Sequence, residues 1–181
     1  MTLNLISLAT VKTQLGLAVD TSDDAITAMI PIVSADVRRI INNNYDKYVD
    51  VVFSDAADTI TPVYAAKNFF MGQVVYHPNL PADTYITGLD PDTGIYSISA
   101  TPTDDGLYIF PTITIAQWPT VSKMIYYRIT KLTTASASEK SAKSKHIGPV
   151  NITYSDAEIN KQWNYPQVLI DDLGVPYSEI G

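Results

Sequence analysis

The spacing of apolar residues changes twice along this chain, and these changes constrain the fold more than any other feature. Near the N-terminus, apolar residues recur at steps of three and four, the period of an amphipathic helix. The residues with this spacing are Ile26, Met29, Ile30, Val33, Val37, Ile40 and Ile41. Between residues 45 and 117 they fall instead in short runs separated by turn residues, as in β-strands. Helical spacing then returns after Pro119. The sequence therefore predicts an α+β fold: a small α-helical bundle with an inserted β-rich domain.

Four helices are predicted near the two ends of the chain. They cover residues 8–15, 23–44, 119–132 and 166–173. Ser7 is a suitable N-cap for the first helix, and Gly16 stands where that helix ends. Pro31 lies inside the second predicted helix, so this helix either bends at Pro31 or begins near it.

Three segments follow from this pattern. Residues 1–47 contain the first two helices, and residues 48–117 form a β-rich domain, which we expect to be a small β-barrel or β-sandwich because its runs are short and nearly evenly spaced. The predicted strands are 49–53, 74–76, 84–87, 94–99, 106–110 and 112–116. Residues 118–181 contain the third helix, a loop rich in Thr, Ser, Ala and Lys at 133–145, a strand at 150–154 and the last helix.

Charge is distributed unevenly along the chain. Residues 45–117 carry a net charge of −7, whereas residues 118–161 carry +4. The whole chain has a net charge of −7, so it is a poor general binder of nucleic-acid phosphates, although it could line a passage for DNA. The sequence lacks cysteine, a basic leader and any apolar run near the roughly 20 residues that cross a bilayer. We therefore expect a soluble protein, made in a cytoplasm, with no membrane association.

Residues suited to catalysis are few. The chain has two histidines, His77 in a predicted turn and His146 at the end of the polar loop, and both are expected to be loop or surface residues. No nucleophile elbow, zinc motif or phosphate-binding glycine loop is present. Asp90, Asp92 and Gly94 resemble part of a calcium loop, but an Asp/Gly turn explains them better. We expect no catalytic residue, no cofactor and no metal ion, and hence no enzyme; an unrecognised hydrolase would need polar side chains converging in one deep pocket.

Two groups of residues have both a structural and a functional interpretation. Lys140, Lys143 and Lys145 could contact DNA phosphates or simply keep their loop solvated. The aromatic residues near the C-terminus, which include Trp163 and Tyr165, could belong to the core or to a surface that binds a partner.

The two ends of the chain also match a known order of elements. Residues 7–15, the aspartate-rich stretch that follows and the long helix ending at Asn44 form the first part; residues 144–155 and then 165–173 form the second. This order resembles the opening helices and the closing strand and helix of head-to-tail connector proteins of tailed bacteriophages, also called adaptor or head-completion proteins. Residues 83–88 and 92–98 are similar to a β-module inserted in some members. The insert here is longer than the hairpin of many connectors, so its role is not carried over.

The resemblance implies a structural protein of the virion. Such subunits form a homo-oligomeric ring, commonly a dodecamer, at the interface of head and tail, and they are assembled in the host cytoplasm. The ring binds the portal protein on one side and a stopper or tail-completion protein on the other, while genomic DNA passes through its centre without sequence-specific binding. By the same resemblance the C-terminal segment docks on the portal. The side chains implied are Trp163, Tyr165, Val168, Leu169, Leu173 and Tyr177.

A rival hypothesis assigns the function to the β-rich domain. It would then be a carbohydrate- or receptor-binding module of a phage tail or cell surface. Tyr85, Tyr96 and Tyr108 would line an exposed face and bind the ligand.

The connector hypothesis predicts the effect of removing the C-terminus. Deletion of residues 162–181 should leave a folded, soluble protein that no longer joins the portal-bearing head. Tyr165, Val168, Leu169 and Leu173 lie on one face of the last predicted helix. If that helix instead belongs to the core, the deletion should lower the melting temperature markedly, because buried apolar side chains are lost. Melting temperature and head binding of the truncated protein separate the two outcomes.

Overall fold

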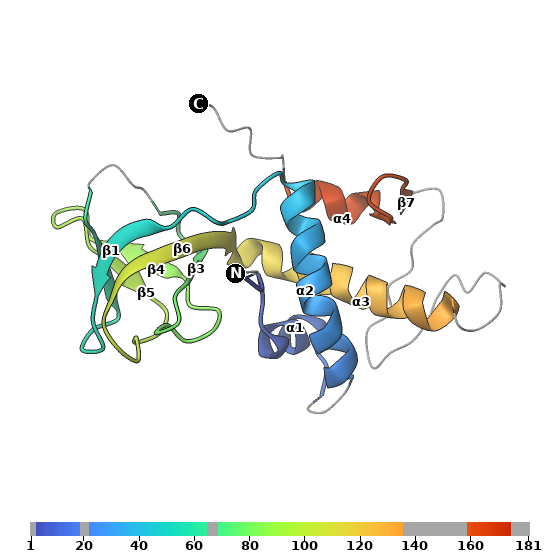
Figure 1. The fold of residues 1–181 in the computed structure, drawn as a ribbon, viewed down its shortest axis with the longest axis horizontal. Helices are drawn as coiled ribbons and strands as arrows, with labels where there is room; N and C mark the ends of the chain where they lie inside the picture. Colours follow the sequence, from blue (N-terminus) through green and yellow to red (C-terminus); the bar gives the residue numbers. More distant parts are fainter. Residues whose placement is uncertain (1–2, 19–21, 65–68, 136–158, 175–181) are drawn as a thin grey trace. The chain divides into compact units, whose positions relative to one another are not determined.

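The structure, a computed structural model, describes residues 3–18, 22–64, 69–135 and 159–174. Within these residues it contains four α-helices and a six-stranded antiparallel sheet that curls into a nearly closed barrel (Figure 1). The chain divides into two compact units. The helical unit comprises residues 1–43 and 117–181, and the β unit comprises residues 44–116. The predicted α+β class is confirmed.

The helices of the helical unit come from both ends of the chain. They are α1 (Leu8–Leu15), α2 (Asp23–Ile40), α3 (Trp118–Ala135) and α4 (Gln167–Asp171). A short 3₁₀-helix, η1 (Ile115–Gln117), leads into α3. A two-stranded hairpin of β7 (Ile159–Asn160) and β8 (Tyr165–Pro166) precedes α4.

The first helix has its predicted bounds, whereas the second and fourth are shorter than predicted. The Ser7 hydroxyl accepts a hydrogen bond from the Thr10 N–H at 3.2 Å, and Gly16 is left-handed with φ 63°. Helix α2 runs through Pro31 without interruption, so a start near Pro31 is wrong. It ends four residues before residue 44 because Asn42 is left-handed, with φ 53°, and the Asn43 N–H turns back to the Arg38 carbonyl at 2.9 Å.

Helix α4 begins after Pro166 because Tyr165 and Pro166 pair with Ile159 and Asn160. It ends at Asp171, two residues before the predicted end.

Helices α1, α2 and α3 pack around a shared apolar core, with α2 crossing α3 (Figure 1). The buried residues include Val11 and Leu15 of α1, Ile26, Ile30, Val33 and Val37 of α2, and Val121, Met124 and Ile125 of α3. Polar contacts fix the N-terminal segment: Ser34 Oγ accepts from the Leu5 N–H at 3.1 Å, and Arg38 donates to the Leu3 carbonyl. Lys12 and Asp23 form an ion pair between α1 and α2.

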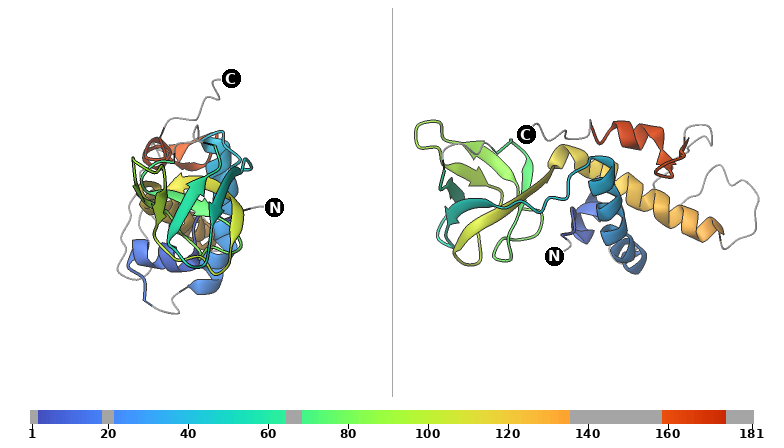
Figure 2. Two further views of the ribbon diagram at one scale, coloured as in Figure 1. Left: turned by 90° about the vertical axis from the view of Figure 1, so that its left-hand side faces the viewer. Right: turned by 45° about the horizontal axis from the view of Figure 1, so that its top comes forward.

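The β unit is one sheet in the order β3-β6-β1-β2-β5-β4. Its strands are β1 (Val49–Phe53), β2 (Thr59–Pro62), β3 (Gln73–Tyr76), β4 (Ile86–Leu89), β5 (Tyr96–Ile98) and β6 (Gly106–Thr114). The two edges of the sheet approach one another through a bridge between Val74 and Tyr85 and through the Gly72 N–H, which donates to the Ile86 carbonyl at 2.8 Å. The sheet therefore forms the curled, barrel-like body seen in Figure 2.

Several strand predictions differ from the structure, among them the run 94–99, of which only Tyr96–Ile98 forms strand β5. The runs 106–110 and 112–116 are one strand, β6, because Pro111 is accommodated opposite Val75, where the register of the β3–β6 pair is irregular. Strand β2 was not predicted, since only Ile60 of its four residues is buried. Strand β4 lies two residues later than the predicted run at 84–87.

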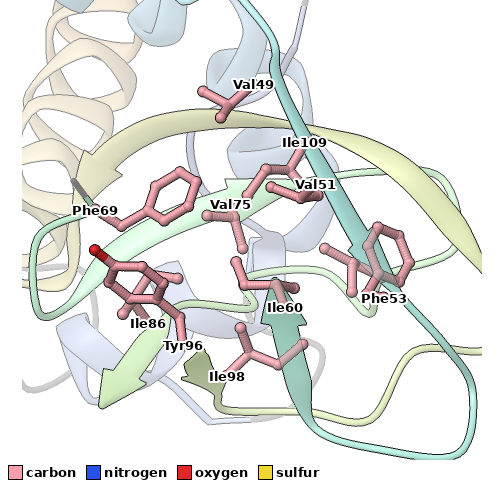
Figure 3. Packing of buried hydrophobic residues seen from close by; sticks show 11 residues of the cluster. Val49, Val51, Phe53, Ile60, Phe69, Val75, Ile86, Tyr96, Ile98 and Ile109 are labelled. Carbon is pink, nitrogen blue, oxygen red and sulfur yellow. The ribbon is translucent and has the colours of Figure 1, made fainter. Parts of the chain in front are cut away.

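The interior of the β unit has its own apolar core (Figure 3). On β1 the side chains alternate, so that Val49, Val51 and Phe53 point inward while Asp50 and Val52 point outward. The buried residues are Val49, Val51, Phe53, Ile60, Phe69, Val75, Leu80, Ile86, Tyr96, Ile98 and Ile109. This core is closed within residues 44–116.

Phe53 fills a space that only glycine leaves open. Gly106 pairs with Phe53 across β1 and β6, and a Cβ atom placed on Gly106 would lie 2.0 Å from the Phe53 ring. The ring and any larger side chain cannot occupy the same volume. Glycine at this position therefore lets the ring complete the barrel core.

We predict that Gly106→Ala destabilises the β unit by about 1–3 kcal/mol, because Phe53 must leave its well-packed position. Gly88→Ala is the matched control, since a Cβ there meets no atom closer than 3.7 Å. Hydrogen exchange of the β1 and β6 amides during urea unfolding measures the stability of the β unit in both variants. Equal stability of the two variants would contradict this packing.

Candidate functional site

The C-terminal segment folds onto α2 and α3, and three of its predicted interface residues lie in the interior. Tyr165 is 0% exposed, and Leu169 and Leu173 are also buried. Trp163 is half-buried, and Val168 is 48% exposed. The five predicted interface residues that the structure describes therefore do not form one surface.

A hydrogen-bonded triad of Asp36, Arg128 and Tyr165 holds this segment in place. Arg128 Nε donates to the Tyr165 oxygen at 2.8 Å, and the Tyr165 hydroxyl donates to Asp36 Oδ2 at 2.7 Å. Arg128 Nη2 donates to the same Asp36 oxygen at 2.7 Å. The guanidinium carbon of Arg128 also lies 4.6 Å from the centroid of the Tyr165 ring. The triad joins α2, α3 and β8.

The electrostatics of the triad keep the Tyr165 hydroxyl protonated. Burial raises the pKa of Tyr165 well above its usual range, and the hydrogen bond to Asp36 raises this pKa further, against the opposing effect of Arg128. Asp36 and Arg128 balance each other's charge. The neutral hydroxyl can then accept from the cation and donate to the carboxylate at the same time.

Two further polar contacts fix the ends of the segment. Lys131 Nζ donates to Asn164 Oδ1, and Gln117 Nε2 donates to the Leu173 carbonyl at 2.7 Å. The prediction that Tyr165, Leu169 and Leu173 present a free face to the portal is therefore wrong, because their side chains complete the core of the helical unit. Trp163 and Val168 keep exposed surface.

Several predicted residues lie outside the described residues. These are Tyr177, the lysines Lys140, Lys143 and Lys145, His146, and the predicted strand at 150–154. Asp36 and Arg128 were not identified from the sequence. Both are charged residues beside the apolar positions Val37 and Ile129, and this placement is the signal that could have pointed to them.

The β unit carries an exposed aromatic cluster, which we call the aromatic face. It consists of Tyr48, Val52, Leu107, Tyr108 and Phe110. Tyr48 and Tyr108 are 59% and 38% exposed, and their ring centroids lie 5.9 Å apart. Phe110 contacts both rings, at 6.2 and 5.8 Å. Tyr108 could be singled out from the sequence, whereas Tyr48, which precedes β1, could not.

His77 connects this face to the core. Its ring lies 4.6 Å from Tyr108 and 5.1 Å from Phe53, and Nδ1 accepts from the Asn79 N–H at 3.1 Å. Burial lowers the pKa of His77, so the ring is neutral and its Nδ1 can accept. His77 lies in a turn after β3, as predicted, but it is buried rather than at the surface, because the Phe53 and Tyr108 rings enclose it.

The three tyrosines of the rival hypothesis do not share a face. Tyr96 is a core residue that packs against Phe69, at 5.1 Å between ring centroids. Tyr85 lines an open, mainly apolar hollow of about 420 Å³ together with Met71, Ile86 and Ile115. Only Tyr108 belongs to the aromatic face.

Asp90 forms a turn of its own. Its carboxylate accepts from the Thr93 hydroxyl at 2.7 Å and from the Asp92 N–H at 3.0 Å, and these bonds lower the pKa of Asp90. Across the described ranges, no three His, Asp or Glu side chains gather as they would around a metal ion. Nor does any helix in those ranges have the length and apolarity that crossing a bilayer requires.

A scan against protein-family models gives no match for this chain, and a search of curated proteins gives no similar sequence.

We predict that the helical unit loses stability in alkaline solution through Tyr165. Because its folded pKa is raised, the stabilisation by the neutral hydroxyl is complete below the unfolded value of about 10 and is lost as pH rises above it. Tyr165→Phe should lose about 2 kcal/mol at neutral pH, since two hydrogen bonds to charged groups disappear. Above pH ~10 the stability of the variant should also decline less steeply with pH than that of the wild-type protein. Thermal melting followed by helical circular dichroism measures both, and parallel pH profiles would contradict the role of Tyr165.

We also predict that deletion of residues 162–181 unfolds or strongly destabilises the helical unit. The deletion removes Tyr165, Leu169 and Leu173, whose burial contributes at least ~4 kcal/mol. Deletion of residues 175–181 alone is the matched control, because it keeps all three. An unchanged melting temperature in the longer deletion would show that the segment is not part of the core.

Proposed function

We propose that this protein is a structural head-to-tail connector subunit of a tailed bacteriophage, without enzymatic activity. The observation that carries the proposal is that the N-terminal helices and residues 165–173, which hold part of the resemblance to connectors, fold together in one helical unit. The β unit is inserted between them and closes its own core. This organisation fits a connector bundle that carries an added module.

A ring of identical subunits fits the proposed role. Each junction in such a ring uses two different surfaces of the same subunit, and the rotation between neighbours closes the ring. The ring, of dodecameric type, would bind the portal on one side and a stopper or tail-completion protein on the other. Genomic DNA would pass through its centre. The protein would then reside at the head–tail interface of the virion.

The burial of Tyr165, Leu169 and Leu173 changes which C-terminal residues can contact the portal. Among the predicted interface residues that the structure describes, Val168, at 48% exposure, and half-buried Trp163 keep accessible apolar surface. We therefore propose these two side chains as portal contacts. The hidden residues hold them in position, because Val168 lies on α4 next to buried Leu169.

Electron microscopy of the protein mixed with the products of its neighbouring genes tests the proposal. We expect rings that attach to a portal, and we expect Val168→Asp to reduce this attachment while the melting temperature changes little. Protein that stays monomeric in the presence of a portal, under conditions where the portal itself is assembled, would contradict the connector function.

Carbohydrate or receptor binding is a second candidate function. The exposed rings of Tyr48 and Tyr108 favour it, because aromatic rings pack well against sugars and peptides. The burial of Tyr96 counts against the original three-tyrosine site.

A further inference from the structure

The aromatic face is built by the outward side of β1 and β6. Tyr108 lies opposite Asp50 in the register of the two strands, and Tyr48 packs against Phe110 one step further along. Val52 and Leu107 extend the face toward the end of β1, and both are more than half exposed. Cross-strand neighbours on one side of a sheet act together, and ring contacts join Tyr48, Tyr108 and Phe110 into one surface.

Carboxylates surround this apolar surface. Asp50 points outward between Tyr48 and Val52, Asp46 precedes Tyr48, and Asp104 and Asp105 directly precede β6; all four are exposed. The described residues of the β unit contain nine aspartates and one lysine, Lys47. The face therefore offers aromatic rings and methyl groups in a negative field.

A lysine-rich segment has the complementary chemistry. Its alkyl stem packs on apolar groups such as Val52 and Leu107, while its ammonium group reaches a tyrosine ring or a carboxylate. A neutral sugar could stack on the rings and donate hydroxyl hydrogen bonds to the carboxylates, but it would gain nothing from the net negative charge itself. The charge around the face therefore favours a cationic partner over a neutral one.

The chain itself contains such a segment. Residues 140–145 hold Lys140, Lys143 and Lys145 among serines and alanine, within the stretch 118–161 whose net charge is +4. The β unit has the opposite sign, with a net charge of −7. Two copies of this chain can therefore contact each other through unlike, complementary surfaces, as a ring requires.

We propose that the aromatic face binds the lysine segment 140–145 of a second copy of this chain. The proposal rests on the proposed function, because it supplies one contact between neighbouring subunits of the ring. One such contact is weak, since exposed cation–π and ion pairs each change affinity only a few-fold. A closed ring repeats the contact at every junction, and this multiplies its effect.

A peptide titration tests the face separately from ring formation. The probe is a fluorescent synthetic peptide of residues 136–147, and the receiving protein is the full chain with Lys140, Lys143 and Lys145 changed to Gln, so that its own segment does not compete. We expect saturable binding at low salt that weakens as salt is raised to ~0.5 M. A peptide with the same three lysines replaced by Gln should not bind.

Variants of the receiving protein locate the contact. The double variant Tyr48→Ser and Tyr108→Ser should weaken peptide binding roughly 10-fold, and the isosteric Asp50→Asn should weaken it roughly 3-fold without disturbing the core. Tyr64→Ser is the matched control, because Tyr64 is a 65% exposed tyrosine of the β unit outside the aromatic face. It should leave the peptide affinity unchanged.

The outcomes distinguish this proposal from the connector function. If neither the tyrosine variant nor the Asp50 variant lowers the affinity for the peptide, the aromatic face is not the binding site. Wild-type rings that also form with the tyrosine variant overturn it too, while the connector function stands. Peptide binding without rings retains the face and contradicts the connector function. If the wild-type chain stays monomeric and the peptide does not bind, a second copy of the chain is not the occupant. If the protein binds a sugar but not the peptide, and the tyrosine variant loses sugar binding, the carbohydrate function is favoured instead.

Discussion

The contact among Asp36, Arg128 and Tyr165 is the one on which the helical unit depends. Tyr165 lies 129 residues after Asp36 in the sequence, yet its hydroxyl donates to the Asp36 carboxylate, and Arg128 bonds to both. Removal of Asp36 or Arg128 leaves the other charge partly buried and without compensation, which typically costs about 3–5 kcal/mol. The triad thus fixes one arrangement of α2, α3 and the C-terminal segment. Apolar packing alone specifies such an arrangement less sharply.

This closure explains how the chain tolerates a large insertion. Residues 44–116 complete their own core around Phe53 and Ile109, with Gly106 providing the space for the Phe53 ring. The helical unit needs from this insert only that its two ends return to the bundle. Such an insert can acquire its own surface without disturbing the bundle, and the aromatic face is a surface of this kind.

Local sequence patterns predicted where helices and strands lie along the chain better than they predicted which elements contact each other. The Ser7 cap and Gly16 fixed α1, and the amphipathic spacing placed α2, because these signals act within a few residues. The spacing of Tyr165, Val168, Leu169 and Leu173 predicted one apolar face, and of these four residues Val168 is exposed. The spacing could not say whether the chain itself or a portal covers that face. The charges that decide this, Asp36 and Arg128, lie on other helices. Likewise, Pro111 predicted a break between two strands, and the irregular pairing with β3 accommodates this proline within one strand.

Native-state hydrogen exchange tests the central claim, that both ends of the chain form one cooperative helical unit. At neutral pH the amides of α2, α3 and the segment after Tyr165 should exchange through one shared opening, with similar opening free energies. The Tyr165→Phe variant should lower these free energies by the same amount in all three elements. The amides of β1 and β6 should open separately, because their core is distinct. If the amides of α4 exchange at the rate of an unfolded chain while α2 and α3 stay protected, the C-terminal segment is not part of the unit and the account is contradicted.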